Sequence, residues 1–113
     1  MSEISIINYG LGNVKAFANT YKMLDIPFSI IDDPVDMAQC KRLILPGVGA
    51  FDDAVSRLKK HGFWDELNEH VLILKKPVLG VCIGMHLMAS SSDEGRCEGL
   101  GWFKNRNVSR LLP

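Results

Sequence analysis

The sequence lacks a charge surplus, a long apolar run and a recognisable leader segment. Lysine and arginine together number 13, as do aspartate and glutamate, so the formal net charge is zero. A neutral chain does not offer the basic surface that phosphate backbones attract, which argues against nucleic acid as the main partner. No apolar run approaches the roughly 20 residues that cross a bilayer. Residues 1–4 carry neither a basic flank nor a signal-type apolar core, so we expect neither membrane insertion nor secretion.

Cysteine is also scarce, and its spacing excludes two structural uses. Cys40, Cys82 and Cys97 are odd in number and far apart, which fits neither a disulfide framework nor a paired zinc site. No group of His, Cys and carboxylate residues has the spacing of metal ligands, and the turn around Gly10 and Gly12 lacks the full dinucleotide fingerprint. We therefore expect a protein of the reducing cytoplasm that uses no metal or cofactor.

Apolar segments with the patterns of strands and helices alternate along the 113 residues. Short continuous apolar runs predict strands, whereas apolar residues at spacings of three and four predict helices. The predicted strands cover residues 4–7, 28–31, 43–45 and 78–81. The predicted helical segments cover residues 14–24 (with Asn13 as N-cap), 35–40, 51–58, 63–74 and 85–89. This alternation predicts one α/β domain, in which helices cover both faces of an open parallel sheet.

Three glycine-containing turns follow predicted strands, after Ile7, Leu45 and Val81. Ligands of open parallel sheets bind outside the carboxyl ends of the strands. We therefore expect the chemistry of this protein at these turns.

The turn Gly80-Val81-Cys82-Ile83-Gly84 places a thiol between a predicted strand and a predicted helix. This spacing is typical of a nucleophile elbow, with cysteine in place of serine. The amide of Ile83 would then face a developing oxyanion, and Pro46-Gly47-Val48-Gly49 could supply further amides. Two plainer interpretations stay open: Cys82 could be a small buried hydrophobe, and residues 46–49 could be only a tight turn.

Together these segments resemble a known family. The turns Asn8-Tyr9-Gly10-Leu11-Gly12-Asn13, Leu45-Pro46-Gly47-Val48-Gly49-Ala50-Phe51 and Gly80-Val81-Cys82-Ile83-Gly84-Met85 are similar to those of class I glutamine amidotransferases. More closely, they resemble the glutaminase subunits of imidazole glycerol phosphate synthases. Residues 91–95 and 99–101 also fall where those subunits have similar segments, so the resemblance covers the whole chain in order.

The resemblance implies a flavodoxin-like glutaminase that hydrolyses glutamine and passes ammonia to a barrel-shaped cyclase subunit in histidine biosynthesis. By position, Cys82 is the nucleophile that attacks the glutamine amide and forms a thioester, which water then hydrolyses. Ile83 and the turn Gly47-Val48-Gly49 supply oxyanion amides, and this turn could reorganise when the partner binds. Glu94 falls where the family has a glutamine-binding acid.

The sequence departs from the family pattern in two ways. His86 stands where the family usually has a glutamine that contacts the substrate, which alters the length and charge of that side chain. The activating His and Glu of the family lie beyond the position of Pro113, and His61 and His70 are expected as surface or helix-flank residues. We therefore expect residues 1–113 to be the N-terminal part of a single glutamine amidotransferase domain, with little or no activity alone.

Other functions stay open at this stage. A paralogous glutaminase that feeds a surface-sugar amidotransferase would carry similar turns. A non-catalytic flavodoxin-like binding module would keep Cys82 as a structural residue and would not respond to glutamine analogues. A cysteine-elbow hydrolase or a redox sensor unrelated to glutamine is a weaker alternative.

Overall fold

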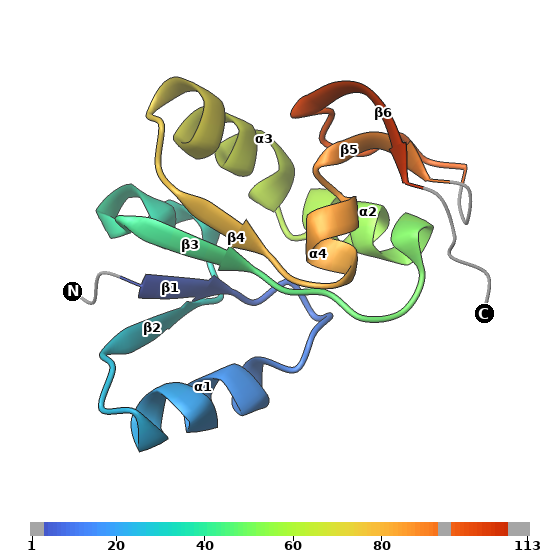
Figure 1. The fold of residues 1–113 in the computed structure, drawn as a ribbon. Coiled ribbons are helices and arrows are strands. Elements are labelled where there is room, and N and C mark those ends of the chain that lie inside the picture. Colours follow the sequence, from blue (N-terminus) through green and yellow to red (C-terminus); the bar gives the residue numbers. More distant parts are fainter. Residues whose placement is uncertain (1–3, 93–95, 109–113) are drawn as a thin grey trace.

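The computed structural model describes residues 4–92 and 96–108, and its centre is a four-stranded parallel sheet (Figure 1). The strands stand in the order β2-β1-β3-β4. Their bounds are Ile4–Ile7 for β1, Phe28–Ile31 for β2, Arg42–Leu45 for β3 and Val78–Gly80 for β4. The chain runs from β1 to one side and returns to the other, so the strand order reverses between β1 and β3, as in flavodoxin-like sheets. The predicted fold class is confirmed.

Helices cover both faces of this sheet (Figure 1). Helix α1 (Val14–Met23) lies on one face, and the side chain of Asn13 accepts the N–H of Ala16 at 3.1 Å, which confirms the predicted N-cap. Helix α2 (Phe51–Lys60) and helix α3 (Phe63–Asn68) lie on the other face and bury their apolar sides against the sheet. In the described part of the chain, no helix has the length and apolar character that crossing a bilayer requires.

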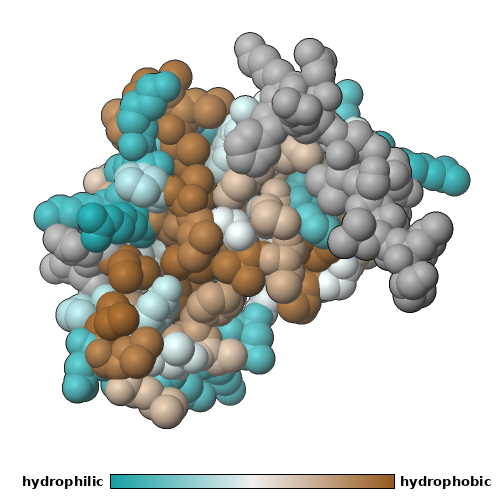
Figure 2. Space-filling model, in the orientation of Figure 1, coloured by the Kyte–Doolittle hydropathy of each residue, from teal (hydrophilic) through white to brown (hydrophobic). Residues whose placement is uncertain are grey.

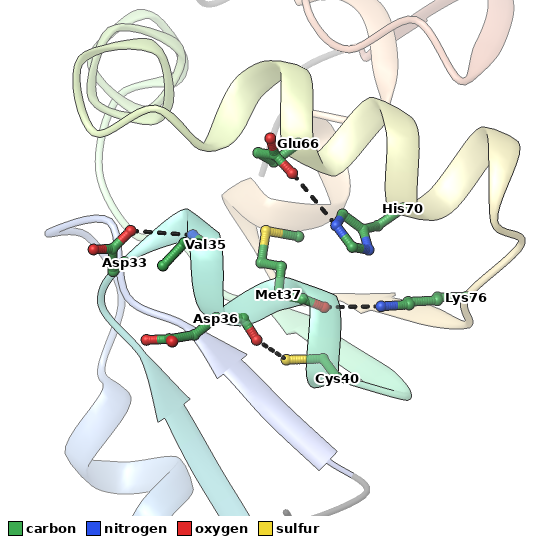
Figure 3. Close-up of polar contacts among 8 residues, drawn as sticks. All are labelled: Asp33, Val35, Asp36, Met37, Cys40, Glu66, His70 and Lys76. Carbon is green, nitrogen blue, oxygen red and sulfur yellow. Dashed lines mark hydrogen bonds and ion pairs between the residues drawn. The ribbon is translucent and has the colours of Figure 1, made fainter.

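A short 3₁₀ helix, η1 (Pro34–Gln39), lies beside α3, on the side of the sheet that α2 and α3 cover (Figure 3). The Nζ of Lys76 donates a hydrogen bond to the carbonyl oxygen of Met37 at 2.8 Å, and the Sγ of Cys40 donates to that of Asp36 at 3.5 Å. Because Met37 and Cys40 are both buried, Cys40 has a structural place in the core.

The predicted helix over residues 63–74 is in fact two pieces, and its second piece corrects the prediction for His70. After α3 the backbone widens into a π-helical turn, η2 (Glu69–Ile73). His70 is only 5% exposed, with its Nε2 3.4 Å from Glu66 Oε2, whereas Leu74 is 54% exposed (Figure 3). His70 lies seven residues after Phe63 and three after Leu67, both buried, so it continues their helical face inward. The π turn then shifts the phase of the helix, so that Leu74 faces outward. His61 is exposed, as expected.

The prediction of a buried helix over residues 85–89 is only partly right: Leu87, Met88 and Ala89 are buried, but the helix ends before them. Helix α4 covers only Ile83–His86, Met85 is exposed, and Ala89–Ser92 forms strand β5, which pairs in parallel with β6 (Phe103–Val108). The physical reason lies in the backbone of residues 99–101, whose N–H groups donate to the carbonyl oxygens of residues 87, 89 and 90. These carbonyls are therefore engaged by a distant segment and do not continue the helix.

Candidate active site

The three glycine turns lie at the carboxyl edge of the sheet and touch one another. A Cβ atom added to Gly12 would lie 2.8 Å from the Cβ of Pro46, and one added to Gly47 would lie 2.9 Å from the backbone nitrogen of Gly84. Backbones approach this closely only where side chains are absent. The turns after β1, β3 and β4, at which the sequence leads us to expect the chemistry, therefore lie together.

Cys82 occupies a strained backbone position between β4 and α4. Its φ of 56° and ψ of −122° lie in a region that non-glycine residues rarely adopt, at a cost of about 1–3 kcal/mol. The turn is held on both sides, because the N–H of Val81 donates to the Leu45 carbonyl and the N–H of Gly84 donates to the Val81 carbonyl, each at 3.0 Å. Cys82 is exposed, so the alternative of a cysteine that fills the core is excluded.

Close packing explains the glycines on either side of Cys82. A Cβ on Gly80 would lie 2.6 Å from Met88 Cε and 2.7 Å from Met85 Cα. A Cβ on Gly84 would penetrate the carbonyl group of Leu45. Glycines two residues either side of the cysteine are therefore a requirement of the turn, as the elbow interpretation predicts.

The predicted oxyanion groups are adjacent but not free. The N–H of Ile83 donates to the carbonyl oxygen of Gly47 at 3.2 Å. Val48 is 51% exposed, and Gly49 has a φ of +94° with nothing within 4 Å of an added Cβ. The turn over residues 47–49 therefore has room to change conformation. As long as it keeps the conformation described here, the N–H of Ile83 remains bonded to the Gly47 carbonyl.

Tyr9 also belongs to this cluster, and our predictions from the sequence did not include it as a site residue. Its side chain is fully buried, and its Oη donates a hydrogen bond to the carbonyl oxygen of Pro46 at 2.5 Å. Burial and the negative charge of Asp53 raise the pKa of the Tyr9 hydroxyl above its usual range, so the hydroxyl stays protonated. A large aromatic residue directly after a buried strand was the available signal.

The structure does not bring the side chain of His86, one of the two remaining predicted residues, to the thiol of Cys82. His86 ends α4, and its backbone N–H donates to the carbonyl oxygen of Cys82 at 3.3 Å. Within the described ranges, no hydrogen bond or ion pair links its imidazole to the thiol. Glu94 lies outside the described residues. Across residues 4–92 and 96–108, no three His, Cys, Asp or Glu side chains gather as metal ligands.

Asp52 anchors the chain that follows residue 95, a role that the sequence did not indicate. Its carboxylate accepts the backbone N–H groups of Arg96 at 2.9 Å and of Cys97 at 2.8 Å. These two bonds lower the pKa of Asp52, and the bond from Arg96 has the larger effect. Desolvation, followed by the neighbouring Asp52 carboxylate, raises the pKa of the Cys97 thiol. In the sequence, Asp52 reads only as an acidic residue that complements the N-terminal dipole of α2.

These features together define a cysteine elbow at the edge of a flavodoxin-like sheet, and comparison with known proteins gives the family. The model of the SNO glutamine amidotransferase family matches residues 11–110. The chain belongs to this glutamine amidotransferase family.

Individual relatives carry a more specific name. "Imidazole glycerol phosphate synthase subunit HisH" of Bdellovibrio bacteriovorus is 50% identical over 103 residues, which are 91% of this chain and 50% of that protein. The subunit of the same name from Leptospira borgpetersenii is 44% identical over the same shares of both chains. "Subunit HisH 2" of Pseudomonas aeruginosa is 43% identical, over 93% of this chain and 52% of that protein. The chain thus spans about half the length of these relatives.

A solved structure supports the fold independently. A chain described as "Crystal structure of glutamine amidotransferase" superposes with a TM-score of 0.75 at 19% sequence identity. The match covers 96% of this chain and 56% of that one. At this sequence identity the similarity establishes the fold alone, so any argument about chemistry must come from the residues of the site.

Proposed function

We propose that residues 1–113 are the nucleophile-bearing part of a glutaminase domain that serves an imidazole glycerol phosphate synthase. In this assignment glutamine is hydrolysed to glutamate, and the ammonia passes to a cyclase partner in histidine biosynthesis. The observation that carries the proposal is the exposed thiol of Cys82 on a strained, tightly bonded turn. Relatives that bear the synthase-subunit name support it over nearly the whole of this chain.

The proposed reaction uses Cys82 twice. Its sulfur attacks the side-chain amide carbon of glutamine and forms a carbon–sulfur bond, while the carbon–nitrogen bond breaks and ammonia leaves with the thiol proton. Water then attacks the thioester, which releases glutamate and returns the proton to the thiol. The resemblance to the family assigns the base for these proton transfers to residues beyond 113, so the described residues supply the nucleophile and its surroundings.

Stabilising the oxyanion requires one peptide group to turn. With the Gly47 carbonyl directed at the N–H of Ile83, neither that amide nor the amide of Val48 can reach a substrate oxygen. Turning the peptide between Gly47 and Val48 would free the first amide and aim the second into the same space. The open surroundings and positive φ of Gly49 support this change, which partner binding would favour.

The β4 side of the molecule supports the proposal that these residues are part of a larger domain. β4 is a terminal strand of the sheet, and exposed apolar side chains gather beside it. Figure 2 shows them as a band over η2 and β4. We call this surface the β4 flank; its members are Leu72, Ile73, Leu74, Leu79 and Met85. Isolated domains rarely leave such a surface uncovered, so we infer that the rest of a domain of the relatives' length covers it.

The glutaminase assignment is tested with the natural gene product and its cyclase partner. We expect Cys82→Ser to lower glutamate release from glutamine by at least about a thousandfold, because the serine hydroxyl is a far weaker nucleophile. The matched control is Cys40→Ala, which removes a buried thiol that lies outside the turn cluster and leaves hydrolysis intact. Hydrolysis that survives Cys82→Ser would contradict the assignment.

A second experiment separates the two ammonia acceptors. His86 departs from the usual glutamine of the family, which favours a divergent member that supplies a surface-sugar amidotransferase. Deleting the gene distinguishes them: we expect a requirement for histidine, and normal growth without histidine would support the divergent paralogue. A binding module without catalysis would show slow alkylation of Cys82 and no effect of glutamine analogues.

A further inference from the structure

We propose that Tyr9 is a positioning residue that holds the Pro46–Gly47 peptide still while the next peptide, between Gly47 and Val48, turns to form the oxyanion site. This inference rests on the proposed glutaminase function, because it assigns Tyr9 a part in that reaction. It concerns a residue that touches neither Cys82 nor the substrate, so its effect passes through the turn over residues 46–49.

The contact of Tyr9 is suited to fixing one peptide plane. Its hydroxyl donates a hydrogen bond to the Pro46 carbonyl oxygen at 2.5 Å. A Cβ added to Gly47 would lie 2.6 Å from the Oη of Tyr9. The carbonyl of Pro46 and the N–H of Gly47 belong to one rigid plane, so a bond to the carbonyl also sets the direction of the N–H. Tyr9 thereby supports the turn from inside the fully buried core.

The following peptide is held less firmly. Its carbonyl accepts only the N–H of Ile83 at 3.2 Å in the described structure, and Val48 beyond it is 51% exposed. The Gly47–Ile83 bond joins two buried residues but is long, and a long backbone bond opens more easily than a short bond from a buried hydroxyl. The turn therefore has a fixed half and a movable half, and the boundary between them is Gly47.

The hydroxyl of Tyr9 keeps its proton across the pH range in which a glutaminase works. Burial, and in second place the charge of Asp53, raise its pKa above the ordinary value. A phenolate could not donate to the Pro46 carbonyl, so this environment preserves the contact on which the fixed half depends.

The kinetic test is Tyr9→Phe in the natural gene product with its partner. We expect kcat for glutamine hydrolysis to fall about tenfold, a fraction of what losing an oxyanion donor costs, with KM changed less than about twofold. Alkylation of Cys82 by iodoacetamide should stay at the wild-type rate, because that displacement builds no oxyanion. The matched control is Ser5→Ala: Ser5 is fully buried, and its Oγ lies 2.8 Å from Ser29 Oγ. We expect its kcat to be unchanged.

A second measurement does not depend on activity. The N–H of Ile83 is bonded to the movable peptide, whereas the N–H of Val81 is bonded to the Leu45 carbonyl, ahead of the turn. We expect Tyr9→Phe to speed hydrogen exchange at Ile83 about tenfold relative to Val81, and Ser5→Ala to leave this ratio unchanged. A wild-type exchange ratio in Tyr9→Phe overturns the proposal, as does an unchanged kcat. An altered ratio in a protein that hydrolyses no glutamine supports the contact and contradicts the proposed function instead.

Discussion

The carboxyl edge of the sheet and the β4 flank belong to the same small domain but differ in packing. The carboxyl edge is closely packed, whereas the β4 flank exposes apolar side chains. At the carboxyl edge, backbones of three turns approach so closely that Gly12, Gly47 and Gly84 leave no room for a methyl group. At the β4 flank, large apolar side chains such as Leu79 and Ile73 are 56% and 72% exposed. The backbone contacts of the first region are made entirely by the described residues. The second region exposes apolar side chains that we infer another segment covers.

The difference indicates that presenting the Cys82 thiol and activating it depend on different parts of the protein. The elbow geometry of Cys82 depends on contacts that all lie within residues 4–92, so the thiol is presented without help from elsewhere. In the proposed assignment, the base lies on the polypeptide that would cover the β4 flank. Under that assignment, an elbow that its own residues hold in place is activated only when its neighbour arrives.

The largest expected effect comes from filling the carboxyl edge. Gly84→Ala places a methyl group inside the carbonyl of Leu45, so we expect a loss of at least about 3 kcal/mol in unfolding free energy. Gly49→Ala is the matched control, because nothing lies within 4 Å of its added Cβ and only the strain of its φ of +94° remains. That variant should lose about 1–2 kcal/mol. Urea unfolding measures both, and equal losses would mean that the turns are less tightly packed than described.

An intermediate effect is expected from making the β4 flank polar. In a purified chain of residues 1–113, we expect the exposed β4 flank to cause self-association. Leu79→Lys should weaken this self-association about tenfold, which corresponds to roughly the burial of one leucine. Met23→Lys is the control: Met23 is 84% exposed but lies on α1, on the opposite face of the sheet. Sedimentation velocity over a concentration series measures the change. If the Met23 variant dissociates as readily, association does not involve the β4 flank.

The smallest effect concerns Asp52, which ties the chain after residue 95 to the carboxyl edge. Because its folded-state pKa is lowered from 3.8, the anchor contributes fully above that value and is lost as the pH falls through the lower folded-state pKa. We expect Asp52→Asn to speed amide exchange at Arg96 and Cys97 roughly fivefold at neutral pH, since a neutral acceptor binds N–H groups more weakly.

The control for this anchor is Asp65→Asn, which removes the same charge from the first turn of α3. It should leave exchange at Arg96 and Cys97 unchanged at every pH. In the wild-type protein, the same two amides should lose protection on acidification below pH 3.8. Protection that persists in Asp52→Asn would show that these amides are held by other groups.

Local sequence signals were sufficient for the sheet and for the elbow. The strands are short, mainly apolar runs, which Asn8, Asp32 or Pro46 follows or which a glycine ends. The helical spacing of Phe51, Ala54, Val55 and Leu58 gives α2 directly. The cysteine turn was recognised because its glycines are required by backbone contacts that any such elbow makes. Each of these features depends on neighbours in sequence or on one general packing rule.

Features that depend on distant segments were missed. Residues 85–89 are good helix formers, and strand β5 exists because residues 99–101 engage their backbone. His70 is buried because it continues the helical face of Phe63 and Leu67, whereas the phase change that exposes Leu74 arises from a π turn, which has no strong sequence signal. The contacts of Tyr9 with Pro46 and of Asp52 with Cys97 join residues about 40 positions apart, a distance that residue patterns do not encode.

The reversal of strand order between β1 and β3 has a consequence for biosynthesis. It assembles one site from turns at residues 10–12, 46–49 and 80–84, so the site cannot exist until a ribosome has delivered about three quarters of these 113 residues. Closing loops of such length is entropically cheap, but the closures must occur together. A nascent chain therefore carries an ordinary thiol, and the elbow that distinguishes Cys82 arises only when folding is complete.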